Sequence, residues 1–106
     1  MPKFLVQAAY TAEGLQGLQK DTASGRRAAV VKAVESVGGT LESMHYVLGA
    51  EDVIMIMDLP DAKAAAALGV AATASGAARS RATALLTITE MDEALTRRPD
   101  FRAPGR

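Results

Sequence analysis

The stretch LESMHYVLGAEDVIMIMDLPD, residues 41–61, decides the fold. Residues 40–48 alternate well enough to predict a strand. Residues 53–59 form a short apolar run, which is typical of a buried strand. Between the two runs, the sequence supplies a glycine and two acids, residue types that turns favour. The pattern therefore predicts a β-hairpin, with Glu51 and Asp52 in its turn.

A helix is predicted on each side of this hairpin. On the N-terminal side, residues 24–37 carry an apolar stripe at helical spacing, with Ser24 as the expected N-cap and two glycines at the end. On the C-terminal side, Asp61 is the expected N-cap of an alanine-rich helix that ends at Gly76. Its small residues predict that this helix lies close to the layer it covers.

The outer segments complete the pattern. Residues 3–10 and 78–89 predict the first and last strands. Thr11 is a suitable cap for a short helical turn, and three glycines before residue 26 argue against one long unbroken helix. Thr89 and Asp92 resemble a capping box for a short helix that ends near Leu95.

The order of elements is therefore βαββαβ with one small added helix. We predict an α+β, ferredoxin-like fold: a four-stranded antiparallel sheet with two long helices on one face. A single domain spans residues 1–96, and a proline- and arginine-rich tail spans residues 97–106. Strand alternation turns Phe4 and Ala8 toward the helices and leaves Gln7 on the bare face.

Composition limits the classes of partner. The chain has 106 residues, with twelve basic and twelve acidic side chains, so no nucleic-acid or membrane partner is expected. Many of its apolar residues are alanines and only 4% are aromatic, which predicts a thin core and a homo-oligomer, dimer or higher, that buries the bare face. With no cysteine, no membrane-length apolar run and no signal-peptide pattern, we expect a cytoplasmic protein without a cofactor.

Polar residues on the strands are the candidate ligand-binding residues: Gln7, His45, Arg79 and Arg81. His45 and Tyr10 are the catalytic candidates, since a histidine suits a general base or a haem or metal ligand. A histidine at a subunit contact is the favoured alternative, because no second ligand stands at metal-site spacing. On the second predicted strand, Ser43 and His45 point to one face, and Met44 and Tyr46 point to the other. Only one of these two pairs can therefore share a face with Gln7. Arg79 and Arg81 could either bind an anion or form salt bridges between subunits.

Other polar groups carry simpler interpretations. Glu51, Asp52, Asp58 and Asp61 could form a metal site across copies, but each has a structural role in a turn, strand end or helix cap, so no metal site is predicted. Arg26 and its neighbour Arg27 could help a helix N-terminus bind an anion, although a solvated helix start is favoured. Tyr10 and Tyr46 could bind a polar ligand or pack at the edge of the core.

Four segments together resemble the GYD domain family: YTAEGLQGL from residue 10, residues 25–49, residues 58–83 and LLTITEMDEA from residue 85. The resemblance covers roughly residues 3 to 95. In the motif that gives the family its name, Gly49 and Asp52 match, whereas Glu51 stands where a tyrosine is expected. The resemblance implies a ferredoxin-like fold and an oligomer of the dimeric α/β barrel type, without an established activity.

Two functional hypotheses follow, and a third concerns the tail. The first is a homo-oligomeric small-molecule-binding or interaction module, with a polar-lined pocket at the subunit interface. The second is a dimeric-barrel enzyme, oxygenase- or isomerase-like, that acts on a small apolar substrate with His45, Tyr10 or Arg81. The third is a structural oligomer in which residues 97–106 embrace a neighbour. The first is favoured, because residues suited to chemistry are sparse.

Overall fold

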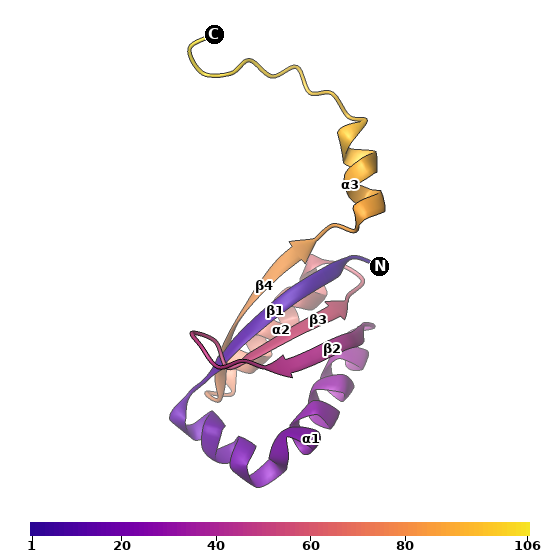
Figure 1. Cartoon of the computed structure of the whole chain (residues 1–106). Helices are drawn as coiled ribbons and strands as arrows, with labels where there is room; N and C mark the ends of the chain where they lie inside the picture. Colours follow the sequence, from indigo (N-terminus) through magenta and orange to yellow (C-terminus); the bar gives the residue numbers. More distant parts are fainter.

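A computed structural model describes all residues, 1–106. Figure 1 shows one sheet with helices behind it and a C-terminal extension. The elements in chain order are β1 (Lys3–Tyr10), α1 (Ala12–Ser36), β2 (Thr40–Tyr46), β3 (Val53–Asp58), α2 (Ala62–Ala74), β4 (Ala78–Leu85) and α3 (Ile88–Leu95). The four strands are antiparallel in the order β2-β3-β1-β4. The prediction of a ferredoxin-like α+β fold is confirmed.

Helix α1 is sharply bent at Thr22, whose φ of 66° is not helical. The Thr11 side chain caps the first half by accepting a hydrogen bond from Gly14 N at 3.1 Å. Thr22 Oγ1 in turn accepts a hydrogen bond from Gly25 N at 3.3 Å, so Thr22 caps the second half. The prediction of a break is confirmed, but Ser24 as the cap is wrong. Both residues can cap a helix, and the left-handed backbone at Thr22 selects the earlier one.

The other helix ends follow local capping rules. Asp61 Oδ1 accepts a hydrogen bond from Ala64 N at 2.9 Å, and Gly76 ends α2 with a φ of 77°, as predicted. The cap of α3 is Thr87, which forms a reciprocal capping box with Glu90. The predicted Thr89 cap is wrong because the longer Glu90 side chain reaches back to the Thr87 backbone. The last strand consequently ends at residue 85.

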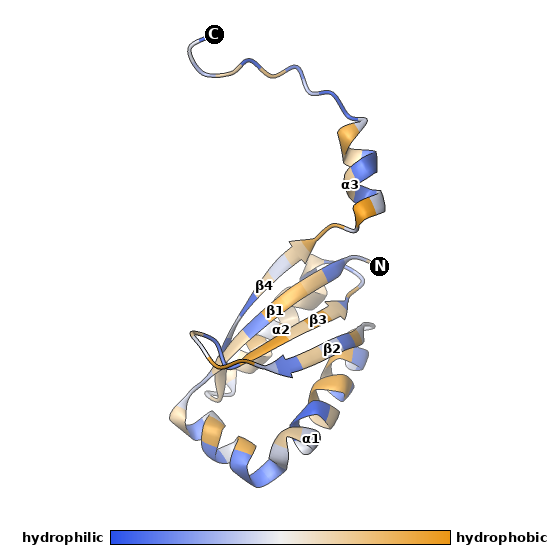
Figure 2. Ribbon diagram, in the orientation of Figure 1, coloured by the Kyte–Doolittle hydropathy of each residue, from blue (hydrophilic) through white to orange (hydrophobic).

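The hydrophobic core is small, as predicted. Only ten of the 106 residues are buried. Eight of them form the apolar core between the sheet and the helices: Phe4, Ala8, Val34, Val53, Met55, Met57, Leu59 and Ala64. Figure 2 shows apolar residues concentrated on the central strands.

The second half of α1 and all of α2 lie behind one face of the sheet, while the other face is bare (Figure 1). Helix α3 and the tail extend away from the sheet, and the apolar side chains of Ile88, Leu95 and Phe101 are exposed there. None of the three helices combines the length and the hydropathy that crossing a membrane requires.

Candidate functional site

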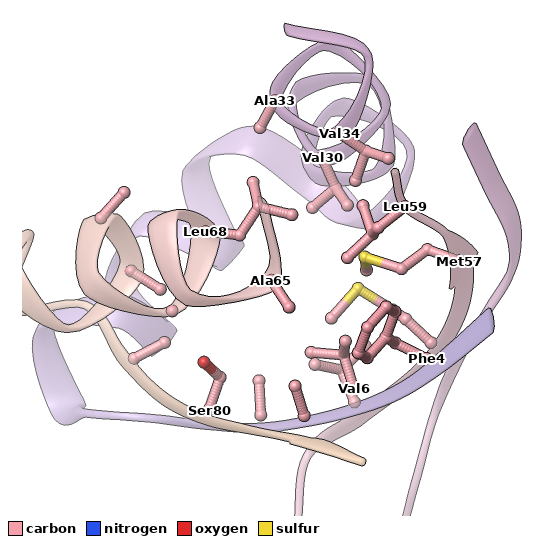
Figure 3. A pocket seen from close by; sticks show the side chains of 18 of the residues that line it. Phe4, Val6, Val30, Ala33, Val34, Met57, Leu59, Ala65, Leu68 and Ser80 are labelled. Atoms are coloured by element: carbon pink, nitrogen blue, oxygen red, sulfur yellow. The ribbon is translucent and has the colours of Figure 1, made fainter. Parts of the chain in front are cut away.

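An apolar cavity of about 590 Å³ lies between the sheet and the two long helices. In Figure 3, Val30 and Val34 of α1 and Leu68 of α2 point toward the same space, with Ser80 of the sheet on the opposite side. Twenty of the 24 lining residues are hydrophobic, with Tyr10 counted among them for its ring. The arrangement is a hydrophobic compartment within one chain that is partly open to solvent, since Ala62, Ala66 and Ala82 of its lining are exposed.

The cavity exists because the side chains of α2 are short. Ala62, Ala65, Ala66, Gly69 and Ala72 all line it. These side chains end within one carbon of the backbone, so they cannot fill the space left between α2, α1 and the sheet. The prediction that small residues bring α2 close to its neighbours therefore holds only along β4, beside which α2 packs.

Polar groups meet the cavity at few points: Tyr10, Arg26, Ser75 and Ser80. Arg26 is the only charged residue of the lining. It forms none of the ion pairs of the structure, which join Lys3 to two acids and Arg81 to Glu51. The cavity is therefore an apolar space with one unneutralised positive charge.

Tyr10 and Tyr46 are neighbours at the Arg26 end of the cavity. Partial burial, reinforced by the adjacent Tyr10 hydroxyl, raises the pKa of Tyr46 to about 12, while the Arg26 charge acts in the opposite direction. A phenol hydroxyl can donate one hydrogen bond to a polar group beside it. This end of the cavity consequently carries the Arg26 cation and the Tyr10 hydroxyl in its lining, with the Tyr46 hydroxyl beside them.

The predicted ligand-binding residues lie on the other side of the sheet. Strand register places His45 beside Ile54, Ile54 beside Gln7, and Gln7 beside Arg81, in one row across the bare face. Gln7 therefore shares this face with Ser43 and His45, and not with Met44 and Tyr46. Since neighbouring strands lie about 4.8 Å apart, the backbones of His45 and Arg81 are separated by three strand spacings, about 14 Å.

Arg81 is already engaged on that face. Its Nη2 donates hydrogen bonds to Glu51 Oε1 at 2.7 Å and to Gln7 Oε1 at 3.4 Å. Arg79 pairs with Ala9 in the next position along the strands. Of the two roles predicted for Arg81, anion binding and a salt bridge between subunits, the structure shows a salt bridge, but its partner Glu51 belongs to the same chain.

The four acids considered as a metal set have separate partners. Asp52 Oδ2 accepts a hydrogen bond from Tyr10 N at 2.7 Å, and Asp58 Oδ1 lies 3.1 Å from Lys3 Nζ. Glu51 pairs with Arg81, and Asp61 caps α2. Asp52 thus fastens the hairpin loop to the end of β1, whereas an added Cβ at Gly49 would meet no atom within 4 Å.

Sequence reasoning placed the favoured pocket at a subunit interface and gave it polar walls. Within one chain the structure contains an apolar cavity lined by Arg26 and not by Arg81, while the pocket at a subunit interface stays a prediction. The sequence signal for this cavity was the set of alanine and glycine positions on one face of α2. Their spacing shows that they share a face. It does not show that the space beside them is unfilled, because that depends on the distance between the helix and the sheet.

The family model described as GYD domain matches residues 4–95 of the chain. The comparison with curated proteins found no match to the chain.

Proposed function

This chain belongs to the GYD domain family, and we propose that it binds a small apolar molecule in the cavity between its sheet and its helices. The supporting observation is the cavity itself. Its volume of about 590 Å³ lies within the range of roughly 300–1,000 Å³ typical of small-molecule sites. Such sites combine mostly apolar walls with a few polar groups, as here.

Energetics also favour an occupant. Atoms that line an empty apolar space lack contact partners on one side, so they lose dispersion energy. In a chain with only ten buried residues, an apolar ligand would add substantially to the packed interior. Binding would therefore also stabilise the fold.

A binding role fits the residues better than catalysis does. The oxygenase- or isomerase-like alternative relies on His45, Tyr10 or Arg81. His45 and Arg81 lie on the bare face, and only Tyr10 lines the cavity. A tyrosine with no adjacent base has no proton acceptor to activate it.

The test is titration with N-phenyl-1-naphthylamine, a neutral apolar fluorophore. We expect one site per chain. Ala65→Phe places a ring in the cavity and should abolish binding (Figure 3). Ala67→Phe is the matched control, since Ala67 is exposed on the same helix and does not line the cavity. Circular dichroism checks that both variants are folded. Equal binding by both variants, or none by the wild type, contradicts the proposal.

We also propose that a second copy of the chain covers the bare face. Leu5, Ile54 and Ile56 are half-buried apolar residues at the centre of that face. The ion pairs of Lys3 and Arg81 flank them, which gives the apolar-centre and polar-rim pattern of protein interfaces. Two copies of such a surface can pack by a two-fold axis.

Native mass spectrometry tests this second proposal. The wild type should be an oligomer, and Ile56→Lys should be a monomer because it buries an unpaired charge in the interface. Ala67→Lys, on an exposed helix surface, should keep the wild-type mass. A monomeric wild type at micromolar concentration refutes self-association.

A further inference from the structure

We infer that the molecule bound in the cavity is an apolar monocarboxylate whose carboxylate group is held by Arg26. This inference rests on the proposed function and adds the chemical class of the ligand. It assigns the head of the ligand to the Tyr10 end of the cavity and the apolar chain to the Phe4 end.

The charge balance of the lining is the first reason. Arg26 is the only charged residue among the 24 that line the cavity, and no acid accompanies it there. It has no partner in any ion pair of the structure. A guanidinium stays protonated and has five N–H donors in a planar fork that matches a carboxylate. A ligand with one anionic head supplies the missing counter-charge.

The neighbours of Arg26 are the second reason. Tyr10 lines the cavity, and Tyr46 is close enough to both residues for each to influence its pKa. Phenol hydroxyls donate hydrogen bonds to carboxylate oxygens. Arg26 comes four residues after the bend at Thr22, and the second half of α1 carries it to this end of the cavity.

The length of the cavity is the third reason. From Tyr10 to Phe4 the strand advances six residues, about 20 Å at roughly 3.3 Å per residue. The far end is lined by Phe4, Met57 and Leu59, which carry no charge or hydrogen-bonding side chain. A polar head at one end and apolar walls along the rest fit an amphipathic chain and not a compact polar metabolite.

Three probes of equal chain length test the inference by calorimetry on the full chain: decanoate, decanol and decylamine, each below its micellar concentration. The wild type should prefer decanoate to decanol roughly tenfold or more, and decylamine should bind weakest. Arg26→Met, which keeps an apolar stem, should weaken decanoate roughly 10- to 100-fold, as expected for a lost charge-assisted hydrogen bond. Its affinity for decanol should stay within about twofold.

Arg27→Met is the matched control. Arg27 is the next residue of the same helix, but it is exposed and does not line the cavity. It removes the same charge and should bind all three probes as the wild type does. Arg26→Lys should retain part of the preference for decanoate.

The outcomes separate the two proposals. If decanol binds as tightly as decanoate, or if Arg26→Met weakens both equally, the carboxylate inference is wrong while apolar binding stands. If Arg27→Met reproduces the effect of Arg26→Met, the effect comes from general charge and the inference is also wrong. If neither decanoate nor decanol binds the wild type, both proposals fail.

Discussion

Replacing Ala65 with leucine should stabilise the protein, because the new side chain enters an unfilled apolar space. Ala65 is half-buried on α2 and points into the cavity (Figure 3). Leucine adds three carbons, and each buried methylene-sized group contributes about 0.8 kcal/mol, which gives about 2.4 kcal/mol. Ordering the side chain costs about 0.5–1 kcal/mol. The net gain should be about 1.5 kcal/mol, since alanine and leucine are both good helix formers.

Thermal unfolding of the unliganded protein, followed by circular dichroism, measures this gain. For a domain of this size, about 1 kcal/mol shifts Tm by roughly 4 °C, so the expected rise is about 6 °C. Ala67→Leu makes the same change on an exposed turn of the same helix. It should change the free energy of unfolding by no more than about 0.5 kcal/mol.

A loss of stability in Ala65→Leu would refute the reasoning. Overpacking a filled core costs typically about 1–3 kcal/mol, so a drop of that size means that the space beside Ala65 is closed. A value equal to that of Ala67→Leu would place residue 65 in solvent. In either case the cavity, on which the proposed function depends, would not exist as described. A rise in Tm should be accompanied by weaker binding of the neutral fluorophore.

Gly14→Ala should destabilise the fold by about 1–3 kcal/mol in urea unfolding, because its Cβ would overlap the Ala77 carbonyl oxygen. Gly17→Ala, with no atom within 4 Å, should stabilise it by about 0.5–1 kcal/mol, and equal effects would contradict the packing argument. Because the pKa of Tyr46 is raised from 10.0 to about 12, the unfolded chain loses its proton first and stability should fall between those pH values. With Tyr46 41% exposed, solvent screening reduces this loss to about 1 kcal/mol, and Tyr46→Phe should remove it in urea unfolding at about pH 9 and 11.5. Hydrogen bonds from its N-cap lower the pKa of Glu90 below 4.5, so the N-terminus of α3 should stay capped above that pH and fray as pH falls through the lowered pKa, which amide NMR shifts would reveal.

Local sequence signals predicted the framework well, because each depends on residues that are close in the chain. The hairpin turn, the cap at Asp61 and the glycine end of α2 all follow from backbone chemistry within a few residues. The two wrong caps lie two residues from the true ones, at Thr22 and Thr87. In both places several residues could cap, and the choice depends on backbone geometry or side-chain reach.

The site was harder to predict because it is a property of layers that are far apart in sequence. Alternation correctly separated Gln7 and Arg81 from Phe4 and Ala8 on the two faces of the sheet. It could not show that the covered face is incompletely filled. Nor could it place Arg26, since a bend at Thr22 decides which way the second half of α1 runs.

The alanine-rich face of α2 links composition to the proposed function. Alanine is the best helix former, so α2 can form without large apolar side chains. The same shortness leaves about 590 Å³ unfilled against a core of eight apolar residues. The alanines thus stabilise the helix itself, but they contribute less packing against the sheet than larger apolar side chains would. If a ligand supplies that packing, the two effects offset one another, and the melting temperature should rise with ligand concentration as RT ln(1 + [L]/Kd) requires. Decanoate at one hundred times its Kd should add about 2.7 kcal/mol of stability, and Ala65→Phe should remove this increment.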